Sequence, residues 1–414
     1  MKNVGSENFP NNFPKQISPG HDAPARKKPR ILIIGSVPPP SIGPSVAMQR
    51  LVTAPALHQE FEVDFLDISD RRPPGSIGAF DWMNLALGLK HAIQCLKRLI
   101  CRRPRALYLG ISQGTWGYLR DLTFILPALC LRRRVVLHLR GSEFRSFVDR
   151  MPRWLHLLTR YVLARISRMI VLGGGVKGTF AGLVEMDRVT VIPNGIDCDQ
   201  FSTRRGSPAA GRPKRLLYLS SIKRRKGIFL LLEALPRVLA KHADLEVTIA
   251  GVWHCEEERL EAEEVIGRFG LSNNLRFVGE VTGAEKIRVF QDHDMFVFTP
   301  VQPEGLPWVI LEAMSAGLPV VTTSQGAIAE VVEHSVSGLI VQPKADQVAQ
   351  SICYFLENPS AAVEIGQRGR KRVEEHFSEK PYILKLVNLF LDVANGPENL
   401  QSKPLSQTFE PISR

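Results

Sequence analysis

Cysteine is scarce in this 414-residue chain, and its six cysteines are scattered with no Cys-x-x-Cys pair. That distribution excludes a dense disulfide framework and the common zinc patterns, so a reducing, cytoplasmic environment is expected. Long apolar runs are also lacking, because the longest, at 82–89 and 122–131, are too short to span a bilayer. Residues 1–29 have no apolar core of the signal-peptide kind and are predicted to be a disordered basic tail, and 395–414 a second disordered tail.

What is present suits two or three domains of ordinary globular composition, with 44% hydrophobic residues and a formal net charge of +12. The positive charge is uneven, since residues 31–190 hold 22 Lys and Arg against 11 Asp and Glu. Arginines cluster at 102–105 and 132–134. Such clusters favour an anionic membrane surface, although solvated loops explain them equally well. Nucleic-acid binding could use the same charge, but the chain shows no recognition motif for it.

Short apolar runs alternate with amphipathic segments along the chain, which is typical of parallel sheets covered by helices. The first such run, at 31–34, leads into a turn containing Gly43, and that position in an open α/β sheet binds phosphates. A plain Pro-rich loop is the alternative interpretation of this turn. The pattern predicts an α/β fold with a first domain at 30–197, a linker at 198–214 and a second domain at 215–378.

Two glutamates, Glu304 and Glu312, flank an apolar stretch that opens with Gly305 and ends near Gly317. If 304–312 were helical, these carboxylates would be separated by about 12 Å of rise, enough to hold both ends of one long polar ligand. The following apolar run reads as a helix and a buried strand, and a buried carboxylate is costly unless something satisfies it. A surface glutamate beside a buried helix is the plainer alternative.

The stretch from Glu304 to Val321 resembles the donor-site signature of retaining GT-B glycosyltransferases of family 4. The resemblance runs from about residue 30 to 394 and implies two Rossmann-like domains facing a central cleft. It also implies that 379–394 is a helix crossing back to the first domain. The implied activity is that of a retaining, metal-independent hexosyltransferase with a nucleotide diphosphate-sugar as co-substrate and no cofactor.

The resemblance assigns donor-site roles residue by residue. Glu304, with Gly305 and Leu306, would hold the sugar, and Glu312 the ribose hydroxyls. Lys226 would neutralise the leaving diphosphate. The family's arginine is replaced here by Ser221, so Arg224 or Arg225 is expected to supply that charge, with Arg225 the preferred candidate. Gly43 stands where the family usually has a glycine pair.

The first domain would supply the acceptor side. The family's His-Gly is replaced by Arg140-Gly141, and His138 lies two residues earlier on the same strand face. His138 is therefore predicted to reach the cleft as a catalytic group, with a buried core histidine as the alternative. Arg140 and Ser142 are expected to bind the acceptor or a phosphate.

The implied acceptor is a lipid-linked or polysaccharide glycan of the cell envelope, handled in the cytoplasm by a protein that associates peripherally with the membrane. No Asp-x-Asp motif is placed to hold a metal under the diphosphate. A hydrolysing sugar-nucleotide epimerase shares the two-domain fold, but the glutamate pair in its surroundings argues against it. A non-catalytic sugar-nucleotide-binding or scaffolding protein is the alternative from another class.

Overall fold

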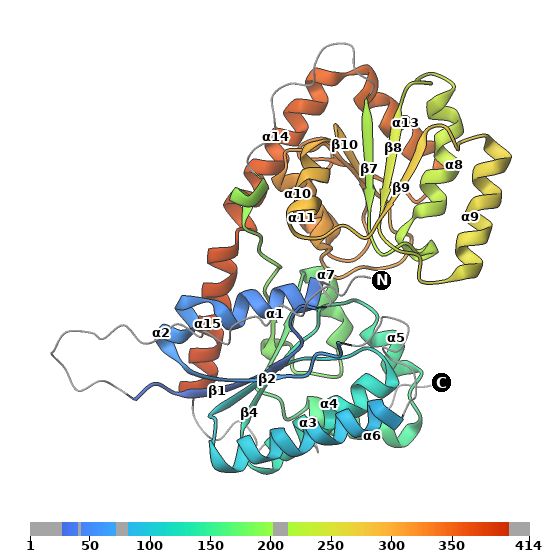
Figure 1. Cartoon of the computed structure of the whole chain (residues 1–414). Helices are drawn as coiled ribbons and strands as arrows, with labels where there is room; N and C mark the ends of the chain where they lie inside the picture. Colours follow the sequence, from blue (N-terminus) through green and yellow to red (C-terminus); the bar gives the residue numbers. More distant parts are fainter. Residues whose placement is uncertain (1–26, 40–42, 72–81, 202–213, 397–414) are drawn as a thin grey trace, which may run out of the picture.

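The structure is a computed structural model that describes residues 27–39, 43–71, 82–201 and 214–396 (Figure 1). Most of the two predicted tails and of the linker lies outside these residues. Two parallel six-stranded sheets, each covered by helices, form two domains, and the predicted α/β class is confirmed.

The first domain is a parallel sheet with the strand order β2-β1-β3-β4-β5-β6. Its first strand is buried on both faces: Leu32 and Ile34 pack into one apolar cluster, while Ile31 and Ile33 pack into another. This explains the unbroken apolar run, because a central parallel strand has no solvent face. The strands are β1 (Arg30–Gly35), β2 (Glu62–Asp67), β3 (Ala106–Gly110), β4 (Arg134–His138), β5 (Arg168–Val171) and β6 (Val189–Val191).

Helices cover the two faces of this sheet unequally. The segments α1 (Gly43–Thr53) and α2 (Pro55–Glu60) lie on one face, where Met48 and Leu57 join the cluster of Ile31. The other face carries α3 (Trp82–Cys101), α4 (Thr115–Cys130), α5 (Phe144–Asp149) and α6 (Arg153–Leu163). A one-turn helix, α7 (Gly174–Lys177), follows β5.

The second domain has the strand order β12-β11-β10-β7-β8-β9, with all strands parallel. Its strands are β7 (Arg215–Leu219), β8 (Glu246–Ala250), β9 (Leu275–Gly279), β10 (Met295–Phe298), β11 (Val320–Thr323) and β12 (Leu339–Val341). Its helices are α8 (Ile228–Leu239), α9 (Glu256–Phe269), α10 (Gly283–Gln291), α11 (Trp308–Ser315), α12 (Ile328–Val331), α13 (Ala345–Glu357) and α14 (Pro359–His376). The order reverses between β7 and β10, so the loops that follow these two strands leave toward opposite sides and open a crevice between them.

The last helix, α15 (Glu379–Asn395), returns to the first domain and covers the face that carries α1 and α2 (Figure 1). Phe390 is fully buried there, with its ring 5.1 Å from Tyr108 and 6.4 Å from Phe61. The guanidinium of Arg134 donates to the carbonyls of Val393 and Gly396 and holds the end of the helix.

The chain passes between the domains twice, and the two passages are bonded to each other. The Ile196 N–H donates to the Phe377 carbonyl at 2.8 Å, and the Glu379 N–H donates to the Ile196 carbonyl at 2.9 Å. This pairing places both connections at a single point, which is the arrangement of a hinge.

The docking of α15 can be tested on its central aromatic. Phe390→Ala should lower the free energy of unfolding of the first domain by about 3–5 kcal/mol, because it leaves a cavity between the helix and the sheet. Leu384→Ala, on the half-exposed side of the same helix, should cost about 0.5 kcal/mol or less. Urea unfolding of both variants is the measurement, and equal losses would contradict the docking.

Candidate active site

The crevice beside β7 and β10 brings together two residues that are 78 positions apart. Lys226 ends the loop after β7, and Glu304 lies in the loop after β10. The Lys226 ammonium donates to one Glu304 carboxylate oxygen at 2.7 Å. Both side chains are largely buried, so each charge removes much of the desolvation cost of the other.

Close backbone packing holds these loops in place. A Cβ on Gly227 would stand 1.9 Å from the Thr299 carbonyl oxygen, and one on Gly326 would stand 1.6 Å from the Glu304 carbonyl oxygen. Both glycines also have positive φ, +87° and +63°, which side chains rarely adopt. Glycine is therefore required at both positions, and it fixes the backbone that carries Lys226 and Glu304.

Glu312 sits in a second ion pair at the other end of the stretch. Its carboxylate accepts a hydrogen bond from the ammonium of Lys286 on α10 at 2.6 Å. The second oxygen of Glu304 and that of Glu312 are both buried without a hydrogen-bond partner in the described structure. Each carboxylate is thus half-satisfied by a lysine and retains one oxygen that can accept from a ligand hydroxyl.

The helical spacing expected for the two glutamates is wrong. The helix α11 begins only at Trp308, with Pro307 at its N-cap, so Glu304 lies in the preceding loop. Proline at the helix start fixes the backbone there, and the loop bends to meet Gly326. The distance between the carboxylates is therefore set by a loop conformation and not by helical rise.

Residues of the first domain bind the 303–306 loop from the opposite side of the cleft. The Ser142 hydroxyl donates to the Pro303 carbonyl at 2.6 Å, and the Asn194 amide donates to the Leu306 carbonyl at 2.9 Å. A Cβ on Gly305 would stand 2.6 Å from the carbonyl oxygen of Arg140. Predicted residues from both domains, Ser142, Gly305 and Leu306 among them, thus meet at one seam.

His138 lies in the core. Its side chain is 0% exposed, and its Nδ1 lies 2.7 Å from the buried hydroxyl of Tyr108. Burial, aided by the charge of Arg140, lowers the pKa of His138 well below its usual value, so the ring is neutral. The structure favours the core alternative, because a catalytic group must reach the cleft and this ring is sealed from it.

The guanidinium of Arg140 also turns toward the core. It donates to the hydroxyls of Tyr108 at 3.1 Å and Tyr382 at 3.3 Å, and its other nitrogen lies 3.5 Å from the Asn194 amide oxygen. All three partners are buried. Arg140 therefore ties the turn after β4 to α15, and its predicted role in binding the acceptor or a phosphate stays a prediction.

Two further predicted residues lie at the rim. Arg225 forms an ion pair with Glu143 of the first domain, so its charge is already engaged across the cleft. Gly43 faces the indole of Trp308, from which a Cβ would be 2.8 Å away. Ser221, which stands where the family has an arginine, is exposed.

Residues 199–372 match the family model described as Glycosyl transferases group 1, which covers the second domain. An uncharacterized glycosyltransferase, MJ1607, of Methanocaldococcus jannaschii is 30% identical over 216 residues, 49% of this chain and 54% of that protein. The phosphatidyl-myo-inositol mannosyltransferase of Mycolicibacterium smegmatis is 30% identical over 190 residues, 45% of this chain and 47% of that protein. The chain thus spans about half the length of the curated relatives it matches.

A solved structure, that of Anabaena Alr3699/HepE in complex with UDP and glucose, superimposes over 87% of this chain and 99% of its own with a TM-score of 0.67. The two sequences are 18% identical. The fold is that of the GT-B glycosyltransferases. The resemblance inferred from residues 304–321 is confirmed at that level, and its assignment to family 4 stays a prediction.

Several residues of this GT-B cleft were not predicted. Lys286 has no sequence signal, because a single lysine on a surface helix is common. Glu330 follows the Gly-containing turn at 325–326, and its two carboxylate oxygens accept the N–H groups of Gly174 at 2.9 Å and Gly175 at 2.8 Å in the first domain. The run Gly173-Gly174-Gly175 was the available signal, since consecutive glycines permit such close approach.

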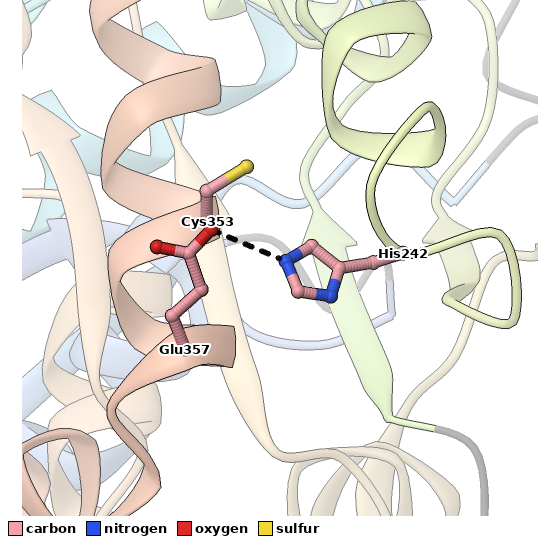
Figure 2. A group of neighbouring side chains, drawn as sticks. All are labelled: His242, Cys353 and Glu357. Atoms are coloured by element: carbon pink, nitrogen blue, oxygen red, sulfur yellow. Dashed lines mark ion pairs between the residues drawn. The ribbon is translucent and has the colours of Figure 1, made fainter.

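A separate polar group lies between α13 and the turn after α8, near the amino end of β8 (Figure 2). His242 precedes β8, and its Nε2 lies 3.7 Å from a carboxylate oxygen of Glu357, one helical turn beyond Cys353 on α13. Among the described residues, these three place ligand atoms close enough to hold a metal ion. The Lys241 ammonium lies 3.3 Å from the same oxygen. The GT-B cleft lies at the carboxyl ends of the strands of the second sheet, so this group takes no part in it.

Two glycines with positive φ test how far Glu304 depends on its surroundings. Gly317 and Gly326 have φ values of +71° and +63°, but only Gly326 has backbone within reach of an added Cβ. Gly317→Ala should cost about 1–2 kcal/mol of stability from conformational strain alone. Gly326→Ala should cost more and should also displace Glu304. Urea unfolding of both variants checks this, and equal costs would contradict the packing.

Proposed function

We propose that this protein is a retaining glycosyltransferase of family 4 that transfers a hexose from a nucleotide diphosphate-sugar to an acceptor. The observation that carries the proposal is the pair of buried carboxylates, Glu304 and Glu312, each bonded to one lysine and each with a second oxygen free. A site of this kind accepts hydrogen bonds from hydroxyls at two separated points, as a sugar and a ribose on one diphosphate would supply.

Donor binding would exchange the partners of Lys226. A diphosphate placed between the two carboxylates offers the ammonium a more concentrated negative charge than Glu304 does. The freed carboxylate can then accept from sugar hydroxyls, with the N–H groups of Gly305 and Leu306 beside it. At the other end, the carboxylate of Glu312, paired with Lys286, can accept from the ribose hydroxyls.

Cleavage of the glycosidic bond develops negative charge on the leaving diphosphate and positive charge on the sugar. Lys226 is a fixed cation at the phosphate, and Glu304 is an anion beside the sugar, so both charges are stabilised as they form. The departing phosphate would accept the proton of the acceptor hydroxyl on the face where the new bond forms, which retains the anomeric configuration. We therefore propose turnover without a metal ion or a cofactor.

For the acceptor we propose a lipid-linked or polysaccharide glycan of the cell envelope, elongated in the cytoplasm. The similarity to a phosphatidyl-myo-inositol mannosyltransferase supports an acceptor with a lipid part. The cleft offers the acceptor the seam formed by Ser142 and its neighbours in the first domain.

Two departures favour a second candidate, a non-catalytic protein that binds sugar nucleotides. Ser221 carries no charge, and Arg225, its expected substitute, is engaged by Glu143. If Arg225 does not leave Glu143, Lys226 alone faces the diphosphate. Binding without transfer would then be the outcome.

The first test measures nucleotide binding, which both candidates require. UDP, GDP or ADP at about 100 times its dissociation constant should stabilise the fold by about 2.7 kcal/mol, because it binds only the native cleft. Melting curves measure this, with Lys226→Met as the variant that should lose most of the shift.

The same donor sugars are then incubated with lipid-linked acceptors in the presence of EDTA. Product with the donor's anomeric configuration, read by NMR, supports the transferase. Binding without product supports the second candidate, and an unchanged melting temperature with all three nucleotides contradicts both.

The ribose assignment can be tested on Glu312 and its lysine. Glu312→Ala should weaken donor binding by about 10- to 100-fold, because the hydroxyls lose a charged acceptor that contributes about 1.5–3 kcal/mol. Lys286→Ala should weaken it less, since Glu312 remains. Glu364→Ala removes a carboxylate that is paired with Arg368 on the exposed side of α14, so it is the matched control. Calorimetric titration that gave equal affinities for Glu312→Ala and this control would contradict the assignment.

A further inference from the structure

The outer side of α3 exposes a continuous apolar stripe. The helix has 20 residues, and Cys95 and Leu99 face the core. Five large apolar side chains are nevertheless at least two-fifths exposed: Leu85, Leu89, Ile93, Leu96 and Ile100. At about 100° per residue they fall within an arc of about 80°, so they form a single line along the helix.

A second stripe lies on α6 in the same helical layer. Trp154, Leu157 and Tyr161 are three and four positions apart, on one side of the helix, and all are well exposed. The helix α4 packs against α3. Tyr118 of α4 packs its ring on Phe147 of α5, and α5 in turn contacts α6. Both stripes thus belong to the layer that covers one face of the first sheet (Figure 1). Exposed apolar patches of this extent mark interaction sites.

The charged residues of α3 and α6 themselves have one sign. Neither α3 nor α6 contains an acidic residue, and residues 82–134 hold ten Lys and Arg against one acidic residue, the fully buried Asp121. Lys90 and Lys97 are both exposed and lie seven positions apart, along one border of the α3 stripe. Apolar side chains bordered by cations are typical of helices that lie in a membrane interface.

From this combination we infer that α3 and α6 dock the first domain on an anionic phospholipid surface. Lipid is favoured over a second copy of the chain, because a symmetric dimer would bring the same cations face to face. The apolar stripe would enter the acyl boundary, and Lys90 and Lys97 would lie at the headgroups. No helix in the described part of the chain has the length and apolar content to cross a membrane.

We expect this surface, and not the arginine cluster at 132–134, to be the membrane contact. Of the three arginines at 132–134, only Arg132 is exposed, while Arg134 is engaged with the end of α15. Replacing that loop would therefore damage the fold. The α3 stripe has no such structural role, since the core-facing residues Cys95 and Leu99 lie about 100° around the helix from the centre of the stripe.

The docked orientation also suits a lipid-linked acceptor. The strand β2, which precedes α3 along the chain, ends at the edge of the first sheet that faces the cleft. The helix runs from there toward the opposite edge over about 30 Å. A bilayer along α3 would then pass beside the cleft mouth, where an acceptor held in the membrane can enter. This last point rests on the proposed function, whereas the docking itself does not.

Vesicle flotation of the full chain, without nucleotide or acceptor, tests the docking. The wild type should float with phosphatidylglycerol-containing vesicles and far less with pure phosphatidylcholine. The triple variant Leu89→Gln, Ile93→Gln, Leu96→Gln should remain unbound at low and at high salt. Lys90→Gln with Lys97→Gln should bind about 25-fold more weakly, about fivefold for each charge. High salt should bring the wild type close to this variant.

Control variants carry the same kinds of substitution elsewhere. Leu260→Gln with Val363→Gln alters exposed apolar residues of the second domain, and Lys371→Gln with Lys380→Gln removes exposed lysines of α14 and α15. Both should float like the wild type, and melting curves confirm that every variant is folded. Absence of wild-type flotation, equal loss in the controls, or a dimer that only the triple variant abolishes would each overturn the inference. Loss of vesicle binding with nucleotide binding intact leaves the proposed function standing, and the reverse result leaves the docking standing.

Discussion

The ion pair between Lys226 and Glu304 is the interaction on which the cleft depends. Two charges in a largely buried place are tolerated only when each neutralises the other, so the loops after β7 and β10 must meet. The reversed strand order makes this possible, because it places the two loops at the same end of the sheet, on either side of one crevice. Gly227 and Gly326 then remove the side chains that would keep the backbones apart. A ligand that displaces one partner must supply an equivalent charge, which selects for a polyanion.

The two domains meet through contacts of the same polar kind. Glu330 accepts two backbone N–H groups, Ser142 and Asn194 donate to carbonyls of the 303–306 loop, and Arg225 pairs with Glu143. Apolar side chains also cross this seam, since one continuous apolar cluster contains residues of both domains, whereas the polar contacts exchange readily with water. Interfaces between domains commonly permit the domains to move relative to each other. Here the two connecting segments are hydrogen-bonded to each other at Ile196, so motion would centre on that point.

Much of the fold could be predicted from the sequence. Buried parallel strands leave unbroken apolar runs, and the 304–321 stretch is specific enough to identify the fold type. Side-chain direction could not be predicted in the same way. His138 and Arg140 lie close in sequence to Ser142, which is at the cleft. Both side chains nevertheless point into the core, where His138 contacts Tyr108, and Arg140 bonds Tyr108 and Tyr382, which are distant along the chain. Lys286 and Glu330 also depend on long-range packing, as does the loop conformation that separates Glu304 from α11.

The position of α15 has a consequence for synthesis. This helix is the last described element of the chain, yet its residues Tyr382, Leu386 and Phe390 complete the core of the domain that is made first. While the ribosome is still producing the second domain, the face of the first sheet that contains Ile31, Ile33 and Tyr108 is covered only by α1 and α2 and lacks α15. The first domain therefore waits, partly open and with apolar surface exposed, until translation has passed residue 390. In this protein the first half of the chain reaches its final packing last.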